Sequence, residues 1–199
     1  DQTKVFQHSD FKIFSKNIEN GAVVRAIKAT NCADKSRRFF DDMINFAIKE
    51  GAGGLAYIIY NKDGTVKSPI AKLLGDERLA KIKESANLKD GDAIFFACDK
   101  EKKAANIAGK VRVEIAKQCD LIDSDIFKFC WIIDFPYYEE DEETGRIDFS
   151  HNPFSMPNGG MEALETKHPL EITAFQYDIV CNGIELSSGA IRNHKPEIM

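Results

Sequence analysis

The residues best suited to chemistry lie near the end of the chain, in the segment Tyr177–His194. Its centre is Asn182-Gly183, a dipeptide that tolerates the positive φ angles of a two-residue type I′ hairpin turn. Because side chains alternate between faces along a strand, this turn places Asp178 and Glu185 on one face as diagonal neighbours roughly 7–8 Å apart. Carboxylates at that separation suit metal ions or a phosphate-bound metal between them. The alternative is that both simply face solvent, and the spacing alone does not decide.

Regular pairing across this turn also produces an apolar face suited to packing on a core. The expected cross-strand pairs are Cys181 with Ile184, Val180 with Glu185, Ile179 with Leu186, and Asp178 with Ser187. The apolar face then carries Tyr177, Ile179, Cys181, Ile184 and Leu186.

This segment resembles the late catalytic-core segment of bacterial-type aspartyl-tRNA synthetases, which are class II synthetases. The matching residues are Tyr177, Asp178, Val180, Asn182, Gly183, Glu185, Gly189, Arg192 and His194. The resemblance implies that Glu185, together with Asp178, holds ATP-bound magnesium. It also implies that Arg192 pairs its planar guanidinium with the side-chain carboxylate of L-aspartate, a bidentate contact that lysine would not reproduce.

A single site for Glu185 and Arg192 requires an irregular strand, because strict alternation from Glu185 places Arg192 on the opposite, apolar face. We therefore predict a bulge, or a break in pairing, between Ser187 and Ile191. A regular strand from Glu185 to Arg192 would contradict this prediction.

Two further segments carry the same resemblance. Trp131, Asp134, Phe135 and Pro136 match a Trp-x-x-Asp-Phe-Pro pattern within a strand predicted at 127–135, where Trp131 is expected to be a core residue.

The second segment, 150–155, resembles the family's His-x-Pro-Phe loop. The resemblance places His151 over the bound aspartate; the alternative is an exposed loop histidine. Relatives often carry a second histidine where this chain has Asn152, and the effect of that difference is left open.

The first half of the chain alternates predicted strands and helices without a cluster of histidines, cysteines or paired acids. The expected strands are 22–29, 55–60, 65–67 and 93–98, and the expected helices are 10–18, 34–50, 76–86 and 99–120, with Asp34 and Asp99 as side-chain caps. Helices on one face of a mostly antiparallel sheet would bury the apolar positions, which predicts an α+β, two-layer fold.

This half resembles the GAD domain, a module inserted in the catalytic core of bacterial aspartyl-tRNA synthetases and also found in the B subunit of the tRNA-dependent amidotransferase. The residues that carry the resemblance are Gly51–Ile58, Ser68–Lys72 and Gly91–Phe96. We accordingly expect a lead-in segment at 1–8, a GAD insertion domain at 9–122, and an incomplete class II catalytic core, built on an antiparallel sheet, at 123–199.

Lys103, Lys110 and Lys117 recur every seven residues and share one face of the last predicted helix of this half. This lysine row either contacts RNA phosphates or only solvates the helix. The acidic run 139–143 is expected to be a solvated loop.

Composition sets broader limits. The net charge of −5 argues against indiscriminate nucleic-acid binding. The sequence contains no run of about 18 apolar residues, so it predicts no membrane-spanning helix. Five cysteines without Cys-x-x-Cys spacing indicate reduced thiols and a cytoplasmic protein.

The resemblance implies an aminoacyl-tRNA synthetase that activates L-aspartate with ATP and Mg²⁺ to aspartyl-adenylate and transfers it to the tRNA 3′ end. The tRNA is that of aspartate, and asparagine tRNA stays open as a second substrate; the full-length parent is expected to be a homodimer. The family's ATP-binding Arg-x-Glu motif, final Gly-x-x-Arg motif and anticodon-binding barrel have no counterpart here, so we expect an inactive fragment. The alternatives are a non-catalytic tRNA-binding or scaffolding GAD module, or a purely structural insertion.

Overall fold

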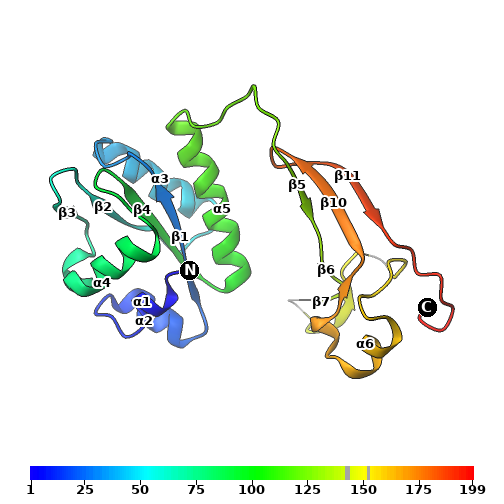
Figure 1. The fold of residues 1–199 in the computed structure, drawn as a ribbon. Coiled ribbons are helices and arrows are strands. Elements are labelled where there is room, and N and C mark those ends of the chain that lie inside the picture. Colours follow the sequence, from blue (N-terminus) through cyan, green and yellow to red (C-terminus); the bar gives the residue numbers. More distant parts are fainter. Residues whose placement is uncertain (142–143, 152) are drawn as a thin grey trace. The chain divides into compact units, whose positions relative to one another are not determined.

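The computed structural model describes residues 1–141, 144–151 and 153–199, which form two compact units, Asp1–Ile122 and Asp123–Met199 (Figure 1). Each unit has its own antiparallel sheets and its own buried cluster or clusters. The predicted α+β class with mostly antiparallel sheets is confirmed. None of the helices in the described ranges combines the length and apolar character needed to cross a bilayer.

The first unit is organised around a four-stranded antiparallel sheet with the order β1-β4-β2-β3. Its strands are β1 (Val23–Ala29), β2 (Ala56–Tyr60), β3 (Val66–Lys67) and β4 (Ala93–Asp99). Its helices are α1 (Thr3–Phe6), α2 (Lys12–Glu19), α3 (Arg37–Lys49), α4 (Ala71–Ser85) and α5 (Glu101–Gln118). The apolar run that begins β4 was predicted to be a central strand, and β4 is flanked by strands on both sides.

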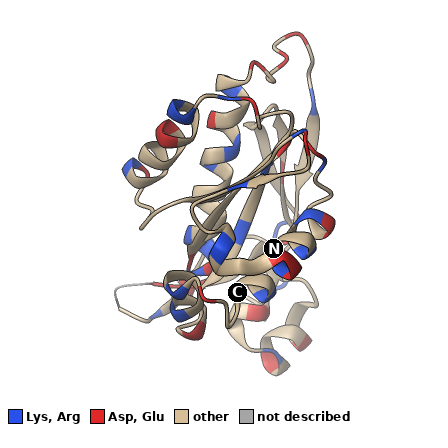
Figure 2. Ribbon diagram, turned by 90° about the vertical axis from the view of Figure 1, so that its left-hand side faces the viewer, with Lys and Arg blue, Asp and Glu red and all other residues tan. Residues whose placement is uncertain are grey.

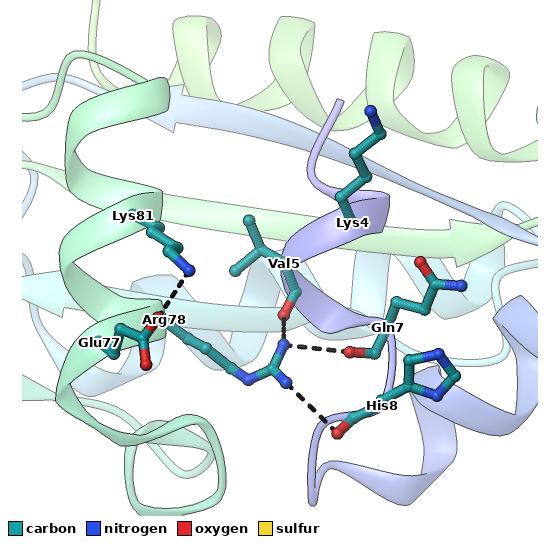
Figure 3. A pocket seen from close by; sticks show the side chains of 7 residues that line it. All are labelled: Lys4, Val5, Gln7, His8, Glu77, Arg78 and Lys81. Atoms are coloured by element: carbon teal, nitrogen blue, oxygen red, sulfur yellow. Dashed lines mark hydrogen bonds and ion pairs between the residues drawn. The ribbon is translucent and has the colours of Figure 1, made fainter.

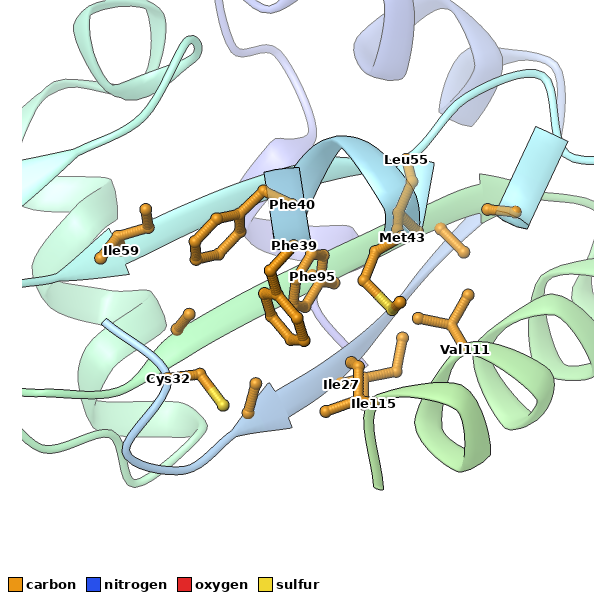
Figure 4. Close-up of a cluster of buried hydrophobic side chains, with 14 of the residues drawn as sticks. Ile27, Cys32, Phe39, Phe40, Met43, Leu55, Ile59, Phe95, Val111 and Ile115 are labelled. Atoms are coloured by element: carbon orange, nitrogen blue, oxygen red, sulfur yellow. The ribbon is translucent and has the colours of Figure 1, made fainter. Parts of the chain in front are cut away.

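Helices cover both faces of this sheet, so the expectation of two layers is wrong and the unit has three. On one face, Phe39, Phe40 and Met43 of α3 and Val111 and Ile115 of α5 pack against the sheet (Figure 4). On the other face, α1, α2 and α4 supply Phe6, Phe14, Leu74, Leu79 and Ile82. The physical reason lies in β4, where every residue from Ala93 to Ala97 is buried. Because successive side chains point to opposite faces, such a strand needs a cover on each side.

The helix starts differ from the sequence-based expectation. Ser36 occupies the N-cap position of α3, while the Asp34 carboxylate accepts a hydrogen bond from the Lys62 ammonium. Lys100 occupies the N-cap position of α5, and Asp99 forms an ion pair with Lys103 at 2.9 Å. A lysine is thus the side-chain partner of each predicted cap, and the Asp99 Oδ1 also accepts from the Lys100 N–H at 2.9 Å.

Residues 1–8 pack as part of the first unit. Phe6 is fully buried, and the Arg78 guanidinium of α4 donates to the carbonyl oxygens of Val5, Gln7 and His8. Figure 3 shows this clamp beside a cavity of about 380 Å³. Arg78 is held by carbonyls and Lys81 by Glu77 at 2.7 Å, so these two of the cavity's cations, Lys4 being the third lysine or arginine, serve the structure of the unit.

The second unit contains a three-stranded antiparallel sheet with the order β11-β10-β5. Its strands are β5 (Phe129–Ile132), β10 (Gln176–Cys181) and β11 (Ile184–Ala190). The smaller elements are the paired strands β6 (Phe135–Pro136) and β9 (Thr173–Ala174), the paired strands β7 (Tyr138–Glu140) and β8 (Ile147–Phe149), helix α6 (Gly160–Thr166) and a 3₁₀ turn at Pro169–Glu171. Its buried cluster is small and consists of Tyr137, Ile172 and Ala174.

The apolar side chains of β5 and β11 are largely exposed, contrary to expectation, whereas those of β10 are half-buried or buried. Trp131 is 60% exposed and is not a core residue, while Ile184 and Leu186 are 67% and 58% exposed. The strand predicted at 127–135 is also broken, because Asp134 adopts a positive φ of 57° between β5 and β6. Within the second unit, these side chains stay outside the buried cluster of Tyr137, Ile172 and Ala174.

Candidate functional site

The hairpin turn that organises the site forms as predicted. Asn182 and Gly183 have φ angles of 50° and 82°, which identify a type I′ turn. The Asn182 side chain also anchors the approach to β5: its Oδ1 accepts from the Lys128 N–H, and its Nδ2 donates to the Ile126 carbonyl, each at 2.9 Å. The turn therefore ties all three strands of the sheet together.

The irregularity predicted in β11 is present, but it lies earlier in the strand than expected. The pairs Cys181 with Ile184 and Val180 with Glu185 match the prediction. The register then shifts, so that Ile179 pairs with Ser187 and Asp178 pairs with Ser188, leaving Leu186 as the extra residue of a bulge. The expected position between Ser187 and Ile191 is wrong.

The bulge at Leu186 places the predicted site residues on a common face. Directly paired residues of an antiparallel ladder share a face, so Asp178 and Ser188 lie on the face that carries Glu185. Counting alternate residues from Ser188 through Ala190 would assign Arg192 to this same face. Without the extra residue, Arg192 would project to the opposite side.

The ladder of β10 and β11 reaches Ala190 and is extended by one bond at Ile191, and from Arg192 onward the chain joins a different partner. The Ile191 N–H donates to the Phe175 carbonyl at 2.9 Å, and Arg192 forms an isolated antiparallel bridge with Ser155. The Asn193 N–H donates to the Phe154 carbonyl at 2.7 Å. This pairing holds the backbone at Arg192 against the segment that follows His151.

Gly189 allows the two strands to approach beside an aromatic ring. A Cβ at this position would lie 2.7 Å from Cε2 of Tyr177, its cross-strand partner. The Tyr177 ring also contacts Trp131 edge-on, with 6.1 Å between the ring centroids. The resemblance motif therefore contains a glycine whose lack of a side chain the sheet requires.

The carboxylate face has an unsatisfied acceptor. Asp178 is half-buried, and its Oδ1 is buried without a hydrogen-bond partner among the described residues; Glu185 is exposed. A buried carboxylate oxygen is costly unless a donor or cation reaches it.

Asp178 and Glu185 fit the ligand preferences of Mg²⁺, which usually binds one or two carboxylates together with substrate phosphates and water. No group of three or more histidines, cysteines and acids able to hold a metal occurs within the described residues. A metal on this face would therefore depend on ligands that arrive with a phosphate-bearing substrate.

His151 lies on the surface, with its ring 5.4 Å from the ring of Phe135 and edge-on to it. Four residues later, Ser155 is almost completely buried, yet its Oγ has no hydrogen-bond partner in the described chain. The Nδ2 atom of Asn193 is likewise buried without a hydrogen-bond partner among the described residues. Sequence reasoning missed both residues, and the only signal for them was their position beside the two motifs. Asn152 lies outside the described residues.

The lysine row on α5 is partly neutralised. Lys103 pairs with Asp99 at 2.9 Å and Lys110 pairs with Glu50 at 2.7 Å. Figure 2 shows positive and negative residues interspersed on the helices of the chain. The row therefore offers a phosphate backbone less free positive charge than its spacing indicated.

Comparison with known proteins identifies relatives for both units. Residues 14–108 match the model of the GAD domain. The whole chain is 61% identical over 203 residues to the Aspartate–tRNA(Asp/Asn) ligase of Rickettsia bellii (strain OSU 85-389), and 59% identical over 200 residues to the protein of the same name from Wolbachia sp. subsp. Brugia malayi (strain TRS). The alignments cover 100% of this chain but 34% and 33% of the relatives.

These matches confirm the resemblance stated from the motifs. The chain is homologous along its entire length to part of aspartate–tRNA ligases, and it spans about a third of the length of these relatives. The match to the GAD domain covers most of the first unit, whereas the identity to the ligases extends through both units.

Proposed function

We propose that this chain is a segment of an aspartate–tRNA ligase and that its second unit contributes to the site for L-aspartate and magnesium-bound ATP. The observation that supports the proposal is the bulge at Leu186, after which Ser188 shares a face with Asp178 and Glu185. Alternation from Ser188 would bring Arg192 to that face as well. The identity to such ligases across both units supports it. That identity also disfavours a stand-alone, non-catalytic GAD module, which would not require the second unit.

In this proposal Arg192 and His151 recognise the amino-acid substrate. Arg192 pairs its guanidinium with the side-chain carboxylate of L-aspartate. Such a contact rejects asparagine, because the asparagine amide would direct its own N–H donors at a group that has only donors. His151, in the segment that leads to the bridge with Arg192, lies over the bound amino acid.

Glu185 and Asp178 hold the magnesium that accompanies ATP. When bound there, the metal would supply charge neutralisation at the phosphates. The reaction is attack of the α-carboxylate of aspartate on the α-phosphate of ATP, which forms aspartyl-adenylate and releases pyrophosphate. Displacement at phosphorus depends mainly on positioning and charge stabilisation, so this chain's contribution is to fix the carboxylates on a rigid sheet.

The relatives' names include both tRNA(Asp) and tRNA(Asn). We extend this to the parent of the present chain, as an enzyme that charges both tRNAs, acts in the cytoplasm and forms a homodimer. The 199-residue chain is expected to be inactive alone, because it spans about a third of the relatives and leaves the apolar faces of its three-stranded sheet uncovered.

The proposal is tested by aspartate-dependent exchange of pyrophosphate into ATP in the full-length parent. We expect Arg192→Leu and Glu185→Gln to lower exchange by about 100-fold or more, in the range found when one transition-state contact is removed. Arg146→Leu and Glu162→Gln, at exposed positions of the same unit, are the matched controls and should stay close to the parent. Parental exchange in correctly folded Arg192→Leu would contradict the assignment of the aspartate site.

A further inference from the structure

The first unit contains a cavity of about 420 Å³ beside the start of α3 and the strands β2 and β3. Its charged lining residues are all cations: Lys35, Arg37 and Lys67. Asn61 and Ser68 add neutral polar groups. This volume lies within the roughly 300–1,000 Å³ typical of small-molecule sites.

The cations of this cavity have few competing partners. Neither Lys35 nor Lys67 forms an ion pair with another described residue; Lys35 lies over the Phe39 ring, 5.8 Å from its centroid. Arg37 has only an exposed ion pair with Asp41, one helical turn away, at 3.5 Å. In the cavity of Figure 3, by contrast, Arg78 is occupied by three carbonyl groups. Three cations without strong internal partners form a local site for an anion on a chain whose net charge is −5.

An aromatic pair lines the same cavity. Tyr57 is half-buried and stacks on Phe40, with ring centroids 4.8 Å apart and an angle of 27° between the rings. Phe40 is 1% exposed and stacks in turn on Phe95 at 5.7 Å. The Tyr57 ring is thus supported by the core and presents a rigid aromatic edge of the cavity.

Two of the three short segments that carried the resemblance of this half of the chain contribute to the cavity. Tyr57 belongs to the segment 51–58, and Ser68-Pro69 begins the segment 68–72. The Ser68 hydroxyl donates to the Tyr57 carbonyl at 2.6 Å and accepts from the Ile70 N–H at 3.1 Å. These bonds lock the exit of β3 against β2 and fix Lys67 beside Tyr57.

We propose that this cavity binds one unpaired nucleotide of an RNA, with its base against Tyr57 and its flanking phosphates at Lys35, Arg37 and Lys67. Single-stranded RNA is bound by cations that follow the backbone together with aromatic rings that contact the bases. This site replaces the lysine row of α5 as the RNA contact of the first unit. It is independent of the proposed aspartate site, since all its residues lie in the first unit.

The test is fluorescence anisotropy of the 199-residue chain with a fluorescein-labelled single-stranded RNA of about eight nucleotides, within the site sizes of single-strand binders. We expect the double variant Arg37→Ala/Lys67→Ala to weaken binding at least tenfold and to reduce the salt dependence by about one released counterion per lost cation. Tyr57→Phe should retain affinity, whereas Tyr57→Leu should lose about tenfold. Lys103→Ala/Lys110→Ala, a matched loss of two charges, should stay within twofold.

Several results would overturn the proposal. They are the absence of binding to the single strand, greater sensitivity to the α5 lysines than to Arg37 and Lys67, and equal affinity for a duplex RNA. Competition by free AMP as strong as that by the oligomer would instead assign the cavity to a mononucleotide. Far-UV circular dichroism verifies that each variant is folded. Pyrophosphate exchange by the full-length parent needs no RNA, so Arg37→Ala/Lys67→Ala should leave it unchanged, and the two proposals can fail separately.

Discussion

At the scale of single residues, Asp92 shows how a buried charge is retained in the first unit. Its carboxylate is 1% exposed and accepts hydrogen bonds from the N–H groups of Asn31 and Lys89, both at 2.9 Å, and it lies 3.1 Å from the Lys28 ammonium. Burial by itself would raise the pKa of Asp92, but these donors favour the charged form and the net pKa is lowered. The loop before β4 therefore depends on a carboxylate that remains ionised.

This arrangement predicts a pH-dependent contribution to stability. Because the folded-state pKa of Asp92 is depressed, its contribution is present above the unfolded value of about 3.9 and is lost as the pH falls through the folded value. Asp92→Asn should lower the free energy of unfolding at pH 7 by about 1.5–3 kcal/mol, and the difference should shrink below about pH 4. Urea unfolding followed by far-UV circular dichroism at pH 7 and pH 3 measures it. A pH-independent difference would contradict the prediction; Asp42→Asn, at a partly exposed position of α3, is the control.

In the second unit, Gly189 is the position at which we expect a small substitution to reduce stability. A methyl group there would lie 2.7 Å from the Tyr177 ring, with both residues fixed in the sheet. We expect Gly189→Ala to destabilise this unit by about 1–3 kcal/mol. Urea unfolding can be followed through Trp131, the only tryptophan of the chain, which contacts Tyr177.

Two further variants separate this contact from general effects on β11. Ser188→Ala, at the adjacent exposed position, should change stability by no more than about 0.5 kcal/mol. Combining Gly189→Ala with Tyr177→Leu should cost less than the sum of the single changes, because the overlap is removed. Strict additivity would show that the ring is not the cause.

At the scale of elements, the bulge in β11 is the feature on which the proposed site depends. Deleting Leu186 would restore regular pairing from Glu185 onward and direct Arg192 to the opposite face. We predict that this deletion abolishes pyrophosphate exchange in the full-length parent, whereas Leu186→Met, which keeps the residue count, leaves exchange within a few-fold. Circular dichroism and Trp131 fluorescence verify that the sheet still forms. Exchange at the parental level in the deletion variant would refute the role of the bulge.

At the scale of the whole molecule, the two units differ in how well they bury apolar surface. The first unit has extensive clusters on both faces of its sheet, whereas the cluster of the second contains Tyr137, Ile172 and Ala174. The second unit also leaves Phe129, Trp131 and Ile184 more than half exposed. Buried apolar area provides most of the stability of a folded domain, so the second unit should be the weaker one.

We therefore expect two separate unfolding transitions in the 199-residue chain. Trp131 fluorescence should report a midpoint at lower urea concentration than far-UV circular dichroism, whose signal comes mainly from the helices of the first unit. In the proposed full-length parent we expect the Trp131 transition to move to higher urea, since cover of the sheet by further parts of the protein would bury these side chains. Coincident transitions in the isolated chain would show that the units stabilise one another.

The sequence by itself determined the features that depend on neighbouring residues. The turn at Asn182-Gly183 needs only two residues that tolerate positive φ, and the central position of β4 follows from its unbroken apolar run. The family resemblance is likewise read from ordered motifs such as Gly51–Ile58, and the comparisons confirm it.

Only the tertiary structure decided the features that depend on residues distant in the chain. The register shift at Leu186 arises in the pairing of β10 with β11, and the Asp34 carboxylate accepts a hydrogen bond from Lys62. The cations Lys35 and Lys67 line one cavity because β3 lies beside the start of α3. Local preferences fix turns and periodicity over a few residues. Strand register, the partner of a charged side chain and the elements that cover a sheet face are set by long-range contacts. Local sequence patterns do not determine which of the alternative long-range contacts is the most stable.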